Sequence, residues 1–107
     1  DFSYIDDVVN GIEKIINKPA KKKIPYNCFN IGNSKPQKLK SYLQEIEKNI
    51  RKKAKIRSKP LQKGDVVKTH SDIKKIKKYA NYNPTTNIEV GIKNFVQWYK
   101  NYFNITN

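Results

Sequence analysis

Apolar residues recur at helical spacing in the N-terminal half of the chain and predict two amphipathic helices there. The first pattern covers residues 8–16 and should end two positions before Pro19, because the residue preceding a proline is biased against helix. Asp6 or Asp7 stands where it could cap the start of this helix. The second pattern covers residues 39–50 and carries lysines on its polar face.

Two further helical patterns follow in the C-terminal half. Their apolar positions are Ile73, Ile76 and Tyr79 in the third helix, and Ile88, Ile92, Phe95, Tyr99 and Tyr102 in the fourth. Ser71 or Asp72 can cap the third helix, and Thr86 and Glu89 stand at capping-box spacing before the fourth. Trp98 and the nearby tyrosines are expected to pack in the core or at its rim.

Three short segments read as strands: Phe2–Ile5, Tyr26–Ile31 and, as an edge strand, Lys55–Leu61. With Cys28 placed in the second of them between bulky neighbours, a buried structural thiol is expected. The chain should therefore fold as α+β, with about four helices and two to three short strands. Residues 1–107 contain no flexible linker or repeat and are predicted to form one small lobe.

Composition adds a strong positive charge. The formal net charge is +14, and almost all of it comes from lysine, with Arg51 and Arg57 as the two arginines. Base readout and phosphate clamps favour arginine, and lysine, asparagine and isoleucine are enriched together, as in proteins from AT-rich genomes. A lysine-rich nucleic-acid-binding module remains the alternative, resting on the clusters at 51–55 and 74–78, and its binding should weaken steeply with salt.

The sequence offers no catalytic or metal site of its own. The four glycines are isolated, so no glycine-rich loop can cradle a phosphate. His70 has no further histidine or cysteine at ligand spacing, which argues against zinc. A nucleophilic pair of Cys28 and His70 is formally possible but less favoured than a structural cysteine. No apolar run approaches the roughly 20 residues of a membrane span, and a cytoplasmic location is expected.

Four segments, in this order, resemble the C-terminal part of extended short-chain dehydrogenase/reductases, and most closely nucleotide-sugar epimerases of the UDP-glucuronate 4-epimerase type. The segments are Asp1-Phe2-Ser3-Tyr4-Ile5-Asp6-Asp7-Val8-Val9, then Phe29-Asn30-Ile31-Gly32-Asn33-Ser34, then Leu61-Gln62-Lys63-Gly64-Asp65-Val66 followed by Thr69-His70-Ser71-Asp72, and finally Pro84 to Ile92 with Phe95-Val96-Gln97-Trp98-Tyr99. The chain opens inside such a motif and contains no methionine, so it is expected to be a fragment of a longer enzyme.

The resemblance implies a substrate-binding lobe whose site residues are Phe2, Gln62, Gly64 and Asp65. Phe2 would pack beside the nucleotide, Asp65 would accept a hydrogen bond from a nucleotide hydroxyl, and Gly64 would allow close approach of the backbone. Gln62 would offer a neutral amide where relatives carry a guanidinium. Asn30 and Asp72 match the pattern too but are interpreted as structural.

The rest of the enzyme is implied by the same resemblance. An N-terminal Rossmann half, absent here, would bind NAD and carry the catalytic residues, so this chain would hold no catalytic, cofactor or metal ligand. The intact enzyme would epimerise a UDP-sugar at C4 by hydride transfer through NAD and would form a homodimer. The fragment alone should be inactive, and should bind nucleic acid only non-specifically.

Overall fold

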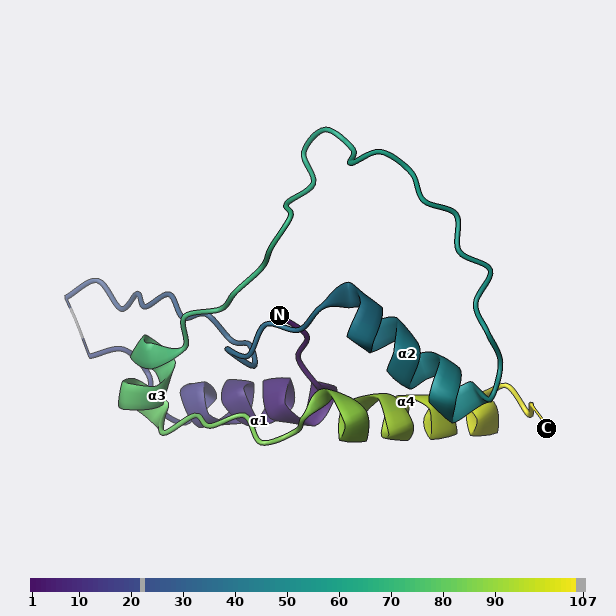
Figure 1. The fold of residues 1–107 in the computed structure, drawn as a ribbon. Helices are drawn as coiled ribbons and strands as arrows, with labels where there is room; N and C mark the ends of the chain where they lie inside the picture. The colour runs from purple at the N-terminus through teal and green to yellow at the C-terminus, as the bar shows by residue number, and fades with distance from the viewer. Residues whose placement is uncertain (22, 106–107) are drawn as a thin grey trace. The chain divides into compact units, whose positions relative to one another are not determined.

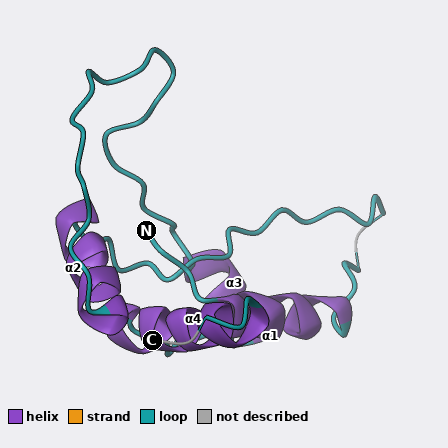
Figure 2. Cartoon of the chain, turned by 90° about the vertical axis from the view of Figure 1, so that its right-hand side faces the viewer, coloured by secondary structure: helices purple, strands orange, loops and turns teal. Residues whose placement is uncertain are grey.

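A computed structural model describes residues 1–21 and 23–105, and its regular secondary structure is helical (Figure 1). The helices are α1 (Ile5–Ile16), α2 (Leu39–Ile50), α3 (Lys74–Ala80) and α4 (Ile88–Tyr102). Long loops join α1 to α2 and α2 to α3, as the teal segments of Figure 2 show. All four predicted helices are therefore confirmed.

The chain divides into two compact units. The first contains residues 1–36 and 68–86, and the second contains residues 37–67 and the described residues from Asn87 onward. Helix α1 packs against α3 in the first unit, and α2 packs against α4 in the second. That residues 1–107 serve as one lobe of a larger enzyme stays a prediction.

The core of the first unit lies around the end of α3. Ile76, Ala80 and Tyr82 are buried there, and Phe29 and Ile31 pack against them while remaining partly exposed. The phenyl ring of Phe29 lies 4.9 Å from the Tyr79 ring, measured between centroids. One apolar face of α3 thus holds the loop that precedes α2.

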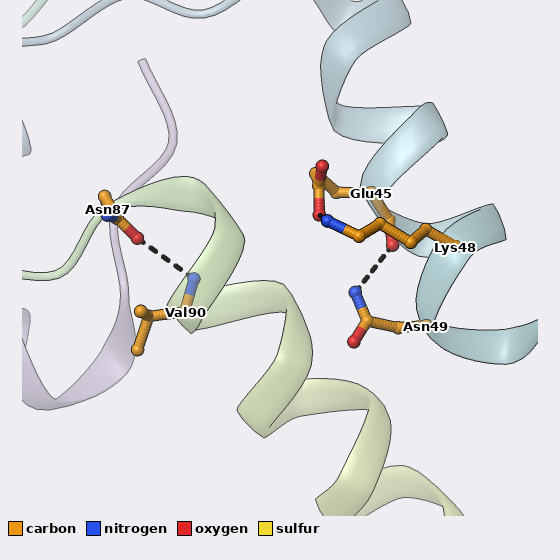
Figure 3. Close-up of polar contacts among 5 residues, drawn as sticks. All are labelled: Glu45, Lys48, Asn49, Asn87 and Val90. Atoms are coloured by element: carbon orange, nitrogen blue, oxygen red, sulfur yellow. Dashed lines mark hydrogen bonds and ion pairs between the residues drawn. The ribbon is translucent and has the colours of Figure 1, made fainter.

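The second unit is a pair of helices joined by apolar side chains. Ile92 and Val96 on α4 are buried, and the α2 residues Leu43 and Ile46 are half-buried. At the start of α4, the Asn87 Oδ1 accepts a hydrogen bond from the Val90 backbone N–H at 3.0 Å (Figure 3). This side-chain cap satisfies one of the N–H groups that a helix leaves unpaired at its first turn.

The three predicted strands were wrong for the described residues, none of which forms a strand. The segment Phe2–Ile5 leads directly into α1, which begins at Ile5. In Tyr26–Ile31, exposure alternates as in a strand, with Asn27, Phe29 and Ile31 half-buried, while residues 55–61 are exposed throughout. A strand requires a ladder partner, and no described segment provides one.

Two capping predictions also need correction. Helix α1 has Tyr4 as its N-cap with no side-chain cap, and α4 is capped by Asn87 in place of the predicted pair of Thr86 and Glu89. Asparagine is at least as good an N-cap as threonine. In addition, the Thr86 N–H is already bound by the carboxylate of Asp7 at 3.0 Å.

The prediction for α3 is closer to the structure. Asp72 Oδ1 accepts a hydrogen bond from the first helical N–H, that of Lys74, at 2.9 Å, although Ile73 occupies the N-cap position. At their C-terminal ends, α2 and α3 stop at residues with left-handed backbone, Arg51 at φ 56° and Asn81 at φ 52°. Among the described residues, no helix has both the length and the apolar character needed to cross a membrane.

Candidate functional site

The densest polar arrangement of the first unit is centred on the carboxylate of Asp1. Its Oδ1 accepts a hydrogen bond from the Asn33 N–H at 3.1 Å, and its Oδ2 accepts from the N–H groups of Ser34 and Ser71, each at 2.9 Å. The backbone nitrogen of Asp1 donates to the Thr69 Oγ1 at 2.7 Å and to the Thr69 carbonyl at 3.2 Å. One residue thus joins two loop segments that are far apart in the sequence.

A second carboxylate, that of Asp7, fixes the loop before α4. Its two oxygens accept hydrogen bonds from the backbone N–H groups of Thr85 and Thr86, at 3.2 and 3.0 Å. The Thr86 carbonyl in turn accepts from the side-chain amide of Asn33, which is buried. Charged acceptors of this kind form stronger hydrogen bonds than neutral ones, so the acidic residues near the N-terminus hold loops in place.

Tyr82 connects this network to the core. Its hydroxyl donates to the Gly32 carbonyl at 3.0 Å inside the protein. Burial raises the pKa of the Tyr82 phenol, and the nearby Asp7 carboxylate adds to this effect. A Cβ on Gly11 would lie 3.0 Å from the Tyr82 ring, and one on Gly32 would lie 2.5 Å from the Ser71 Cβ. Close packing therefore requires glycine at position 32, and a Cβ at position 11 would press against the Tyr82 ring.

A polar hollow opens beside the Asp1 network. It is lined by Asp1, Ser3, residues 29–32 and residues 69–71. At its edge the His70 Nε2 lies 3.4 Å from the Ser34 Oγ. The hydroxyl of Ser71 is buried and has no hydrogen-bond partner among the described residues, which is unusual for a buried polar atom.

A different kind of hollow lies in the second unit. It is lined mainly by apolar side chains of α2 and α4, with basic residues among them: Ile46, Ile50, Arg51, Lys52, Phe95, Val96, Tyr99, Lys100 and Ile105. On α4, Trp98 and Tyr102 are 53% and 67% exposed and stack on each other with ring centroids 5.4 Å apart. These two aromatic residues therefore lie at the surface or rim of the described unit, and the prediction that they could pack in its core was wrong.

The end of α2 carries the shorter of the two ion pairs found among the described residues. Glu47 Oε2 accepts from the Lys53 Nζ at 2.9 Å, and its Oε1 accepts from the Ala54 N–H at 2.8 Å. The backbone hydrogen bond from Ala54, followed by that from Lys53, lowers the pKa of Glu47. Two residues before Glu47, the Glu45 carboxylate pairs with Lys48 at 3.5 Å, and the Glu45 carbonyl accepts from the Asn49 amide (Figure 3).

The predicted substrate residues fall in both units. Gln62, Gly64 and Asp65 share one exposed turn of the second unit, where the Asp65 N–H donates to the Gln62 carbonyl at 3.2 Å. Gly64 has φ +96°, and a Cβ added there would meet no atom within 4 Å. The backbone conformation at this position therefore favours glycine, although the space around it would accommodate a larger side chain. Phe2 is half-buried in the first unit, and a role for these four residues in substrate binding stays a prediction.

The predicted burial of Cys28 was wrong, because this residue is exposed. The alternation along Tyr26–Ile31 turns Phe29 inward and Cys28 outward. Lys75 donates to the Cys28 carbonyl at 2.6 Å, and its Nζ lies 5.0 Å from the centre of the Phe29 ring. Among the described residues, no three histidine, cysteine or acidic side chains gather as a metal site would require.

Sequence reasoning missed the roles of Asp1 and Asp7. Asp7 was interpreted as a possible helix cap, and Asp1 only as part of a family motif. A signal was available for Asn30, which was expected to satisfy backbone groups and does donate to the Asp72 carbonyl at 3.3 Å. The partners of the two aspartates lie 32 to 79 positions away in the sequence, so no local sequence pattern could predict these contacts.

Comparison with known proteins places this chain beside nucleotide-sugar epimerases. It is 36% identical over 113 residues to UDP-glucuronate 4-epimerase 1 of Arabidopsis thaliana, covering 96% of this chain and 26% of that protein. It is 32% identical to the protein CapI of Staphylococcus aureus, over 96% of this chain and 35% of the relative. An uncharacterized protein of Methanocaldococcus jannaschii is 46% identical over 92% of this chain and 29% of its own length.

The chain spans about a quarter to a third of the length of these relatives. No protein-family model matches it. The similarity to UDP-glucuronate 4-epimerases extends over nearly the whole chain, so the sequence is related to part of such an enzyme.

Proposed function

We propose that this chain is the substrate-binding part of a nucleotide-sugar epimerase that acts on a UDP-sugar, with UDP-glucuronate as its substrate. The observation that carries the proposal is the similarity to UDP-glucuronate 4-epimerases over 96% of the chain, with 34–36% identity to five of them. The matched length, 26% of each relative, supports a C-terminal piece of a longer enzyme, as the motif order implies.

The proposed roles within this chain are those of binding. Phe2 packs beside the nucleotide, Asp65 accepts a hydrogen bond from a nucleotide hydroxyl, and Gln62 contacts the diphosphate through its amide. The exposed turn that presents Gln62 and Asp65 has its carboxylate and amide free of steric cover, and the left-handed backbone of Gly64 sets the shape of that turn. An isolated turn of this kind binds weakly, so the remainder of the enzyme completes the site.

NAD belongs to the proposed enzyme but does not fit this chain. Gly11 and Gly32 are packed against Tyr82 and Ser71, and neither can form the open glycine-rich turn that a dinucleotide requires. In the proposal the cofactor supplies hydride transfer at the sugar C4 and is held by the rest of the protein. The intact enzyme is proposed to be a homodimer.

The test is to express the intact gene product and supply UDP-glucuronate. We expect the intact protein to convert it to UDP-galacturonate, which chromatography of the nucleotide-sugars would measure. We expect no conversion by residues 1–107 alone. An Asp65→Asn variant should weaken UDP-sugar binding, while Asp6→Asn, an exposed acid on α1, serves as the control of equal charge change.

An intact protein that converts neither UDP-glucuronate nor another UDP-sugar would contradict the proposal. Binding to nucleic acid that persists at physiological salt, and depends on base sequence, would favour the lysine-rich module instead. Weak, salt-sensitive binding follows from the charge of +14 and would not distinguish the two.

A further inference from the structure

The hollow beside Asp1 combines a fixed frame with polar side chains that are only partly used in hydrogen bonds. Its frame is the pair of segments at 32–34 and 69–71, which the Asp1 carboxylate joins through three backbone N–H groups. Because its oxygens already accept these three bonds, this carboxylate is largely occupied as an acceptor. Asp1 therefore shapes the hollow more than it offers a charge to a ligand.

The lining adds side chains that keep part of their hydrogen-bonding capacity. Ser3, Asn30 and His70 border the hollow and carry a hydroxyl, an amide and an imidazole. The Asn30 amide nitrogen donates to the Asp72 carbonyl and the His70 Nε2 pairs with the Ser34 Oγ, which leaves the Asn30 Oδ1 and the His70 Nδ1 for a ligand. The Ser71 hydroxyl beside them is buried and has no partner among the described residues. Hydroxyl, amide and imidazole groups next to a carboxylate suit the hydroxyl groups of a sugar ring, and the carboxylate disfavours a phosphate.

We propose that Asp1 is a positioning residue that holds this hollow in shape, and that the hollow contacts sugar hydroxyls of the nucleotide-sugar, with His70 as a contact residue. This inference rests on the proposed function and concerns the first unit alone. The hydroxyls belong either to the ribose or to the hexose, and the two sources give different results below.

The experiment measures the affinity of the intact protein for UDP and for UDP-glucuronate by titration calorimetry. His70→Ala removes a lining group and its exposed contact with the Ser34 Oγ but keeps the Asp1 ties, so we expect affinity to fall about three- to tenfold with little change in melting temperature. Asp1→Asn replaces one acceptor oxygen with a donor that faces backbone N–H groups, and should weaken affinity at least as much. Asp1→Glu, which keeps the carboxylate, should recover part of the loss.

The two ligands identify the sugar. Equal losses for UDP and UDP-glucuronate place the ribose in the hollow, and a loss confined to UDP-glucuronate places the hexose there. Asp6→Asn is the control for charge, and neither affinity should change in it.

The inference is overturned if folded His70→Ala and Asp1→Asn proteins bind both ligands as the parent does. It is also overturned if the affinity lost in Asp1→Asn is accounted for by its unfolded fraction, measured by circular dichroism at the same temperature. A parent protein that binds neither ligand would instead contradict the proposed function.

Discussion

Different interactions stabilise the interior of each of the two units. In the first unit, side chains from the N-terminal segment reach backbone groups of distant loops, as Asp7 does with Thr85 and Thr86. In the second unit, two amphipathic helices share an apolar contact, and polar contacts such as that of Glu47 with Lys53 join one helix to its own flanking loop. The first unit is therefore specified by polar ties between remote residues, and the second by helical periodicity.

The sharpest test of this contrast truncates one buried residue in each unit. Ile76→Ala in the first unit and Ile92→Ala in the second should each cost about 2–5 kcal/mol of unfolding free energy, because both side chains are buried. The single tryptophan, Trp98, lies on α4, so its fluorescence reports on the second unit, whereas circular dichroism reports on all helices.

We expect Ile76→Ala to shift the dichroism transition in denaturant and leave the Trp98 transition in place. Ile92→Ala should shift both. If Ile76→Ala moves the two transitions together, the units unfold as one and the comparison fails.

The polar ties of the first unit can be tested at Asp7. Asp7→Asn keeps the shape of the side chain but removes its charge and replaces one acceptor oxygen with a donor, which leaves a backbone N–H of Thr85 or Thr86 unpaired. The expected cost is about 1–3 kcal/mol, read from the dichroism transition. Asp6→Asn on the same helix turn is the matched control, and a cost equal to that of Asp7→Asn would show that charge alone matters.

A smaller effect is expected from Tyr82→Phe, which removes the hydroxyl that binds the buried Gly32 carbonyl. The loss should be about 1–2 kcal/mol. In the parent, the raised pKa of Tyr82 makes the folded state hold its proton longer than the unfolded state. This contribution is complete below the ordinary value of 10.0 and is lost as pH rises through the higher folded value.

The parent should therefore lose stability above pH 10 more steeply than Tyr82→Phe does. Denaturation at several alkaline pH values compares the two slopes. Parallel slopes would mean that Tyr82 does not govern the alkaline loss.

The smallest effect belongs to the second unit. The pKa of Glu47 is lowered by the Ala54 N–H and by Lys53, so this carboxylate stabilises the fold above its ordinary value of 4.5 and ceases to do so as pH falls through its lower folded value. Glu47→Gln should flatten the loss of stability at acid pH that Trp98 fluorescence reports, and it should change stability at neutral pH only slightly, since the partner Lys53 is exposed. If stability falls with decreasing pH as steeply in Glu47→Gln as in the parent, the Glu47 contact does not contribute to the acid dependence.

Helices were predictable from this sequence because their evidence is local. Spacings of three and four residues from Leu39 to Ile50 correctly bounded α2, and Pro19 correctly indicated that α1 ends before it. The strands were not predictable in the same way, since β propensity along Tyr26–Ile31 says nothing about whether a partner strand is present. Residues with the right alternation can therefore remain outside a sheet.

The candidate site shows the same division. The turn at 62–65 was found from its glycine and its motif, and Gly64 does adopt a left-handed conformation. The Asp1 network was not found, because it joins residues up to 70 positions apart through backbone groups, which carry no sequence signal. Side chains that bind remote backbone atoms become visible only once the fold is known.

Helix α2 ends at an arginine in a conformation that suits glycine. A side chain in the left-handed region costs about 1 kcal/mol relative to glycine, and Arg51 has φ 56°. Replacing Arg51 with glycine would recover that energy without moving the backbone. In evolutionary terms, Arg51→Gly is a potential suppressor substitution. A lineage that acquires a useful but destabilising substitution in the second unit can use it to restore the folded population.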